Sequence, residues 1–402
     1  MSMFRKMPFI LLAMIIFASI AHSWLPLSLK STLYAVSLSL KSVIVFVLPF
    51  LIFGLLFKTA VQLAKKASKM ILFLLLAVCV SNFLSTLLSY TVGQLVYRFD
   101  LSMTFPNEAI SLLPAWQLTF PKWVGNDIAM FSGLALGVLL GWWKPSTAEK
   151  LSLHLEKGIE IFLKTFLYAI PLFILGFVIK MNHDQVMTHI LRNYALIFSL
   201  IACALFSYIG FLYLVANRFK RQGLTTSLKN MFPAAVAGFG SMSSAAAMPL
   251  TILGTEKNSQ DPDLARSLIP ATVNIHLIGD CFAIPIFAFA VLKSFGVAEP
   301  SLLNYLMFAS YFVLAKFSVA AVPGGGILVM LPILEGLLGF DAGMLSLITA
   351  LYILFDPVIT CANVLGNGGF AMLLDRCLKR RVKKQAVCFS DTEGKGEYNS
   401  ER

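Results

Sequence analysis

Six ionisable side chains lie inside apolar stretches of this sequence: Lys41, Lys164, His276, Asp280, Lys316 and Asp356. A charged group inside a membrane-spanning stretch is costly, so such residues mark ion or substrate sites by default. Asp280 and Asp356 are too short to reach the membrane surface, so each must face a cavity, an ion or a donor. Lys41 and Lys164 are expected to extend to the interface. Lys316 lies near an expected hairpin tip and could be solvated in a cavity.

Two apolar stretches are interrupted by residues that cannot continue a regular helix cheaply. Residues 238–249 include Ser243, Ser244 and Pro249, and residues 323–326 read Pro-Gly-Gly-Gly. Broken backbone at membrane depth is tolerated only where it is buried in protein or lines a watery cavity. Two such breaks in successive hairpins indicate a midplane binding site of a secondary transporter. The alternative for the Ser/Ala/Gly run is ordinary small-residue helix packing.

Amide side chains form a third candidate element. Asn274 and His276 lie between the two interrupted stretches, and Asn363 and Asn367 lie beyond them, within a glycine-containing run at 363–369. Asparagine oxygens and exposed carbonyls are hard ligands suited to a small cation. Asp280 follows His276 by four residues, which on a continuous helix places both on one face. They therefore form a candidate proton relay; alternatively, His276 only hydrogen-bonds within the bundle.

The elements that must position these residues are apolar helices. The chain has 402 residues, of which 58% are hydrophobic and 13% charged, whereas soluble domains are about 25% charged. This excludes a water-soluble globule, a disordered chain and a nucleic-acid-binding module, and it predicts a polytopic all-α membrane protein. The expected spans are 7–24, 33–57, 71–96, 128–143, 159–179, 190–215, 230–254, 267–292, 303–334 and 344–374.

The charges predict an orientation. With the N-terminus inside and with 230–254 and 303–334 as re-entrant hairpins, most Lys and Arg fall in the inner loops and in the tail, as the positive-inside rule requires. The net charge of +12 is then explained by the Lys and Arg residues of the cytoplasmic loops and the tail. Residues 1–24 are expected to be a retained span, with a cleaved signal peptide as the alternative. The six cysteines form no C-x-x-C and imply neither a disulfide framework nor a zinc site.

The order of these motifs resembles the dicarboxylate/amino acid:cation symporter family, the bacterial relatives of glutamate transporters. The resemblance runs from about residue 39 to residue 379. The serine-rich tip at 243–249 is similar to the family's first hairpin. Val322-Pro323-Gly324-Gly325-Gly326 is similar to the family's second hairpin tip, an extracellular gate. The resemblance implies substrate contacts at Ser243, Ser244, Val322, Pro323 and Gly324.

The last span allows two registers on the family pattern. In the favoured one, Asn363 falls on an asparagine whose backbone binds sodium, and Asn367 replaces a sodium-binding aspartate. Asp356 falls on the aspartate that holds the substrate amino group, and Ile359 falls where an arginine holds a substrate carboxylate. In the register shifted by one turn, Thr360 takes the amino-binding position. Asn274 is retained, and His276 stands in place of a sodium-site aspartate.

Further sodium-site residues are implied in the third span. Ser85 and Thr86 resemble the family pattern there, with Asn82 replacing a tyrosine. The coupling set implied by the resemblance is therefore Ser85, Thr86, Asn274, His276, Asp280, Asn363 and Asn367. Because neither register supplies the arginine that would fork around a carboxylate, a typical glutamate or aspartate site is not expected. Asp280 could replace the missing aspartate.

These observations together predict a glutamate-transporter-like fold of about eight spans and two hairpins, related by inverted repeats. Residues 1–228 would be mainly scaffold and oligomerisation spans, 229–378 a transport core, and 379–402 a basic, then polar cytoplasmic tail. The expected function is elevator-type symport of a small polar solute, such as an amino acid or dicarboxylate. Na⁺ or H⁺ would be the coupling ion, and no other cofactor is expected. The family implies a homotrimer in the cell inner membrane with both termini cytoplasmic.

Two alternatives remain at this point. An uncoupled facilitator or channel on the same fold would explain the lost coupling carboxylates. An intramembrane enzyme would need a pair such as Ser243 or Ser244 with His276, but no base-orienting residue or hydrolase motif accompanies them. For the transporter, we expect Asn274→Ala and Asn367→Ala each to abolish transport while sparing expression.

Overall fold

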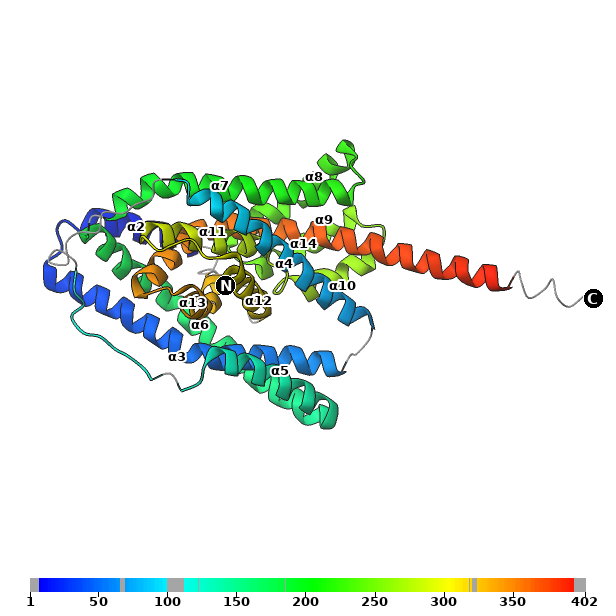
Figure 1. The fold of residues 1–402 in the computed structure, drawn as a ribbon, viewed down its shortest axis with the longest axis horizontal. Coiled ribbons are helices and arrows are strands. Elements are labelled where there is room, and N and C mark those ends of the chain that lie inside the picture. Colours follow the sequence, from blue (N-terminus) through cyan, green and yellow to red (C-terminus); the bar gives the residue numbers. More distant parts are fainter. Residues whose placement is uncertain are drawn as a thin grey trace, which may run out of the picture.

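The structure is a computed structural model that describes residues 7–65, 69–99, 112–121, 123–184, 186–317, 319 and 324–393. Every regular element within these ranges is an α-helix (Figure 1). The helices are α2 (Met7–Ala21), α3 (Leu27–Lys65), α4 (Lys69–Val96), α5 (Asn126–Trp143), α6 (Pro145–His183), α7 (Val186–Ala216), α8 (Arg221–Ser241), α9 (Ser244–Asn258), α10 (Pro262–Thr272), α11 (Ile278–Ser294), α12 (Leu302–Lys316), α13 (Gly325–Leu338) and α14 (Ala342–Glu393).

Each apolar segment expected from the sequence lies in one or two of these helices. Among the described residues, three helical stretches are long and apolar enough to cross a membrane by length and composition: Leu72–Val96, Tyr194–Ala216 and Gly343–Leu378. Shorter apolar helices such as Phe131–Trp143 and Leu302–Lys316 accompany them. Long apolar windows fold as helices because a helix satisfies all its backbone groups within one segment.

Three of the predicted segments are built from two helices each. The segment at 230–254 is the hairpin α8–α9, which turns at Met242 in a left-handed conformation with φ 51°. The segment at 303–334 is the hairpin α12–α13, and Gly324 precedes α13 with φ 72°. The expected single span at 267–292 is interrupted, because α10 ends at Thr272 and α11 begins at Ile278.

The last span is a more regular helix than the glycine-containing run at its centre suggested. Helix α14 runs without interruption from Ala342 to Glu393, so the glycines at 366–369 expose no unwound carbonyls. Added side chains there would clash with Ile278, Met231 and Leu212 on neighbouring helices. These glycines therefore serve close helix packing, which offsets their poor helix propensity.

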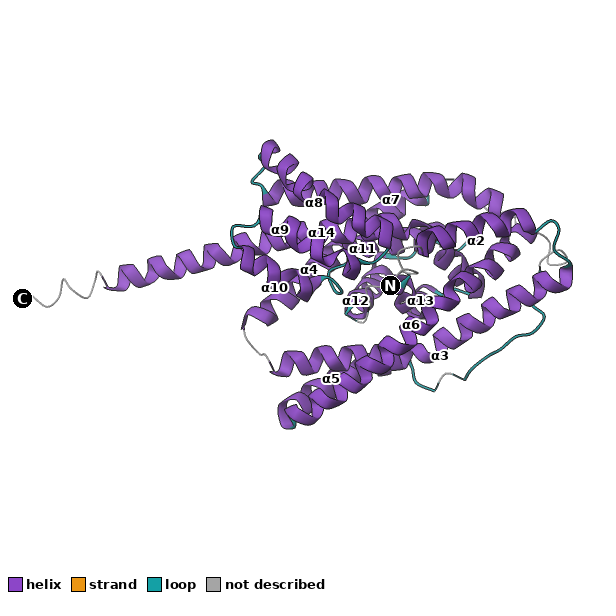
Figure 2. Ribbon diagram, turned by 180° about the vertical axis from the view of Figure 1, so that it is seen from behind, coloured by secondary structure: helices purple, strands orange, loops and turns teal. Residues whose placement is uncertain are grey.

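The helices pack in two groups (Figures 1 and 2). Helix α3 packs mainly on α5 and α6, and α6 also contacts α2. Helices α11 and α14 pack against each other and against α7 and α13. Helix α14 also packs on α8 and α9, and α4 packs on α11 and α12. The contacts of α4 and α7 thus lie with the later helices, although both helices precede residue 228.

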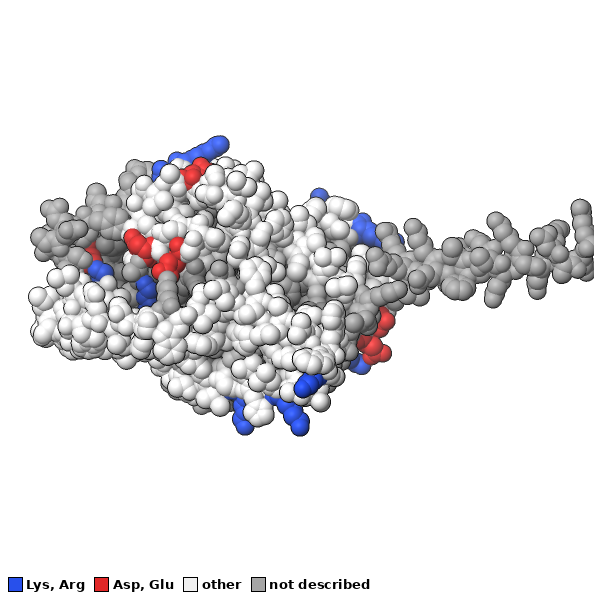
Figure 3. All heavy atoms as spheres, turned by 60° about the horizontal axis from the view of Figure 1, so that its bottom comes forward, with Lys and Arg blue, Asp and Glu red and all other residues white. Residues whose placement is uncertain are grey.

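The surface between the charged regions is uncharged over a broad area. On the face shown in Figure 3, Lys, Arg, Asp and Glu gather toward the left and right and along the upper and lower edges. Large apolar side chains such as Leu76, Leu84 and Leu139 are exposed on the helices. A lipid-facing surface has this character, because it needs no polar groups to meet water.

Candidate functional site

The interrupted helix α10–α11 is held by three asparagines from two neighbouring helices. From α4, Asn82 donates to the carbonyl of Ile275 at 2.7 Å and accepts from the amide of Leu277 at 3.4 Å. From α14, Asn363 accepts from the amide of Gly279 at 2.7 Å, and Asn367 donates to the carbonyl of His276 at 3.2 Å. Amide side chains suit this place because each offers both a donor and an acceptor to unpaired backbone groups.

His276 lies inside the interruption and is completely buried. Its Nε2 lies 2.9 Å from the hydroxyl of Ser81, and its ring stacks on Phe370 with centroids 4.1 Å apart. Within the described residues, its Nδ1 and the Oδ1 of Asn367 have no hydrogen-bond partner.

The expected His276–Asp280 relay is not formed. The two residues lie on opposite sides of the start of α11, so the continuous helix face that the spacing assumed does not exist. Asp280 instead accepts a hydrogen bond from Tyr352 at 2.6 Å and lies 3.3 Å from the Nζ of Lys316. Lys316 is completely buried, so it is not solvated in a cavity, which the sequence had left possible.

Asp356 lies on α14, one turn after Tyr352, and faces the tip of the second hairpin. Its carboxylate accepts from the amide of Gly324 at 2.9 Å and from the hydroxyl of Thr360 at 3.1 Å. Asp356 is buried, and within the described residues no cationic side chain forms a salt bridge with it. The start of α13, with its free amides, therefore points at a buried carboxylate.

The carboxylates Asp280 and Asp356 meet the second hairpin together. A side chain at Gly326 would lie 2.7 Å from Asp280 Oδ1, so the hairpin backbone approaches that carboxylate closely. Two carboxylates and one lysine leave one formal negative charge in this buried cluster. Val322 and Pro323, which the resemblance also placed here, lie outside the described residues.

The first hairpin reaches α14 at Thr360, because a side chain at Gly238 would lie 3.3 Å from that residue's carbonyl oxygen. Ser243 caps α9 by accepting from the amide of Ala246 at 3.2 Å, and Ser244 is buried. The serine tip thus serves partly as a helix start, for which serine is a favoured residue.

The remaining sequence-predicted residues are distributed as follows. Ser85 and Thr86 are buried on α4, where their hydroxyls donate to the carbonyls of Ser81 and Asn82. Their oxygens keep lone pairs for a further ligand. Asn274 is exposed at the interruption and lies outside the set of asparagines that hold the backbone. Sequence reasoning named Asn82 in the third-span pattern but did not count it among the coupling residues, and it missed Tyr352, although a polar residue within an apolar helix was a signal for both.

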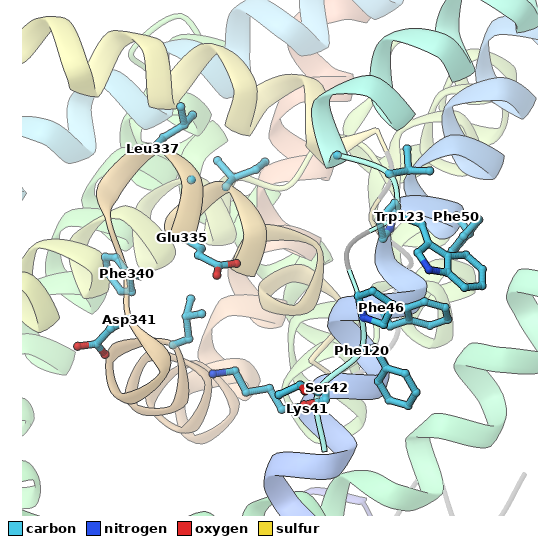
Figure 4. A pocket seen from close by; sticks show the side chains of 18 of the residues that line it. Lys41, Ser42, Phe46, Phe50, Phe120, Trp123, Glu335, Leu337, Phe340 and Asp341 are labelled. Carbon is cyan, nitrogen blue, oxygen red and sulfur yellow. The ribbon is translucent and has the colours of Figure 1, made fainter. Parts of the chain in front are cut away.

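A separate cavity of about 610 Å³ lies where α3 faces α13 and the start of α14. Figure 4 shows Lys41 of α3 extending toward the side that holds Glu335 and Asp341, with Phe46, Phe50, Phe120 and Trp123 at the other side. Lys41 thus lines this cavity, whereas the sequence predicted that it would extend to the membrane interface. The side chain of Lys164 lies outside the described residues. None of the buried cluster residues lines this cavity, which marks the boundary between the two helix groups.

Comparison with known proteins gives a consistent result. Residues 128–377, more than half of the chain, match the Sodium:dicarboxylate symporter family. A stretch of 141 residues is 28% identical to an excitatory amino acid transporter of Onchocerca volvulus, and the same extent and identity are found with one of Caenorhabditis elegans. The match covers 35% of this chain and 28% of the length of each relative.

Proposed function

Because this chain belongs to the Sodium:dicarboxylate symporter family, we propose that it is a secondary active transporter that accumulates a small polar organic solute by symport with Na⁺ or H⁺. The family is one of cation-coupled transporters and not of enzymes, so the Ser–His enzyme alternative is excluded. The proposal adds the site: the buried cluster under the second hairpin binds solute and cation together.

The observation that carries this proposal is the environment of Asp356. Among the described residues, its buried carboxylate is bonded to neutral donors, the amide of Gly324 and the hydroxyl of Thr360. A buried carboxylate of this kind requires compensation, either by a proton that it takes up or by a cation that pairs with it during part of the cycle. The ammonium group of an amino acid or a coupling cation supplies that charge.

The solute class follows from the charges on α14. Between Ala342 and Asp375 this helix carries no Lys, Arg or His. A side-chain carboxylate would therefore lack a fork-like donor on this helix. Among amino acids and dicarboxylates, the site favours a small neutral amino acid whose ammonium group binds Asp356.

The two helix groups support an elevator-type movement, with α4, α7 and α8–α14 as the moving part and α2, α3, α5 and α6 as the scaffold. The cavity beside Lys41 lies along their boundary. The proposal further includes a fold of about eight spans and two re-entrant hairpins, related by inverted repeats. It also includes a homotrimer in the cell inner membrane with both termini cytoplasmic. All of these rest on the family resemblance.

An uncoupled facilitator is the second candidate, and one observation favours it. The two positions at which the family has sodium-site aspartates hold His276 and Asn367, which bond to neutral partners here. A facilitator equilibrates its solute, whereas a symporter accumulates it against a gradient.

Uptake into proteoliposomes tests both candidates. Wild-type protein would be given labelled neutral amino acids and dicarboxylates, with sodium and proton gradients imposed separately. We expect accumulation with one gradient, and a loss of at least about tenfold in Asp356→Asn. The matched control is Asp263→Asn, at an exposed position of α10. Wild-type accumulation in Asp356→Asn would overturn the site, and equilibration by the wild type would establish the facilitator.

A further inference from the structure

The second hairpin carries its own positive charge into the buried cluster. Lys316 is the last residue of α12, and its Nζ lies 3.3 Å from Asp280 Oδ2, with both side chains buried. The ammonium also lies 4.5 Å from the centroid of the Phe312 ring. Within the described residues it donates no hydrogen bond, so its environment is an ion pair and an aromatic face.

Both arms of the hairpin converge on Asp280. The α12 arm reaches it through Lys316, and the α13 arm approaches it at Gly326, where a side chain would clash with Asp280 Oδ1. Tyr352 of α14 also contacts this carboxylate, because its hydroxyl donates to Oδ1 at 2.6 Å. The carboxylate is therefore enclosed by the hairpin and α14, and the cation nearest to it belongs to the protein.

We infer that Lys316 acts as a tethered cation that takes the place of a mobile coupling ion at Asp280. A buried carboxylate under a hairpin requires a compensating charge, and discontinuous helices in transporters commonly supply such sites to Na⁺ or H⁺. Here a compact ammonium on a flexible stem already provides the charge. Its place at the C-terminal end of α12 is favourable for a cation.

The consequence concerns stoichiometry. With Asp280 neutralised by Lys316, the cluster retains only the charge of Asp356 for a mobile cation or for the solute ammonium. Transport therefore needs one mobile cation fewer than it would if Asp280 were free. The conclusion about the number of mobile cations rests on the proposed function, whereas the role of Lys316 as the cation at Asp280 can be tested without measuring transport.

The test measures the melting temperature of the purified protein in detergent at constant ionic strength, in NaCl, LiCl, KCl or choline chloride. We expect Lys316→Met to melt below the wild type in choline chloride. We also expect it to gain a saturable rise of about 3 °C or more with Na⁺ or Li⁺, because a mobile cation now occupies the vacated place. Lys257→Met, at an exposed position of α9, should keep the wild-type cation response.

A second comparison does not depend on the folding of Lys316→Met. The double variant Asp280→Asn/Lys316→Met removes both charges, a change that buried ion pairs often tolerate. It should show the same cation response as the wild type, because the wild type binds no mobile ion at Asp280. A wild-type cation response that disappears in the double variant would overturn the inference. So would a Lys316→Met response equal to that of the wild type.

Discussion

The side-chain oxygen of Asn363 lies 2.7 Å from the backbone nitrogen of Gly279 and accepts its hydrogen bond. Residue 363 belongs to α14 and residue 279 to the first turn of α11, so this contact ties the start of α11 to α14. The first amides of a helix have no partner within it. Asn363 therefore acts as a cap supplied by a different helix.

Removing this cap is expected to destabilise the fold. In Asn363→Ala the amide of Gly279 is left buried without an acceptor, which costs about 1–3 kcal/mol. The free energy of unfolding in detergent would measure the effect. The control is Asn304→Ala at an exposed position of α12, which we expect to change stability by less than about 0.5 kcal/mol. Equal stability of the two variants would refute the capping role.

The same junction predicts a strong effect of added volume at Gly279. A side chain there would lie 2.3 Å from the carbonyl oxygen of Ile359, and the backbone of α14 cannot move away as a flexible side chain can. We expect Gly279→Ala to destabilise the protein by about 1–3 kcal/mol or more.

Gly210→Ala is the matched control for this prediction. Gly210 lies inside α7, and apart from the neighbouring backbone of its own helix no described atom lies within 4 Å of the place that a side chain would take. Alanine there should be neutral or stabilising by about 0.4–1 kcal/mol. Thermal melting of both variants in one detergent would compare them directly, and a tolerated Gly279→Ala would mean that α11 and α14 can separate without cost.

The structure separates two asparagines that the sequence alone treats alike. Asn367 is buried and holds the carbonyl of His276, whereas Asn274 is exposed. We therefore expect Asn367→Ala to lower cation-coupled uptake by at least about tenfold. Asn274→Ala should stay near the wild-type rate, which revises the expectation of equal loss.

Initial uptake rates in proteoliposomes, normalised to the amount of protein incorporated, would check this difference. The cation concentration for half-maximal uptake should rise in Asn367→Ala if the side-chain oxygen of Asn367 is a ligand. Uptake lost in Asn274→Ala but retained in Asn367→Ala would reverse the assignment and place the cation at the exposed side of the interruption.

Much of the candidate site could be predicted from residue types. Asp356, Asn363 and Asn367 stand out because polar groups within apolar helices need partners, and the structure buries all three. The glycine run at 366–369 misled the prediction, because glycine indicates either a broken helix or a close helix contact. Only the neighbours that pack on it, Met231 and Leu212 among them, distinguish the two.

The apolar helices and the two hairpins follow from the amino-acid sequence, because the length of an apolar window and the presence of Pro and Gly act locally. The pairing of Lys316 with Asp280, and the absence of such a pairing for His276, follow only from the packing of the helices. The spacing of His276 and Asp280 indicated a shared face only for an unbroken helix, and the interruption removed it. Which buried charges meet depends on which helices are neighbours, and a one-dimensional pattern does not contain that information.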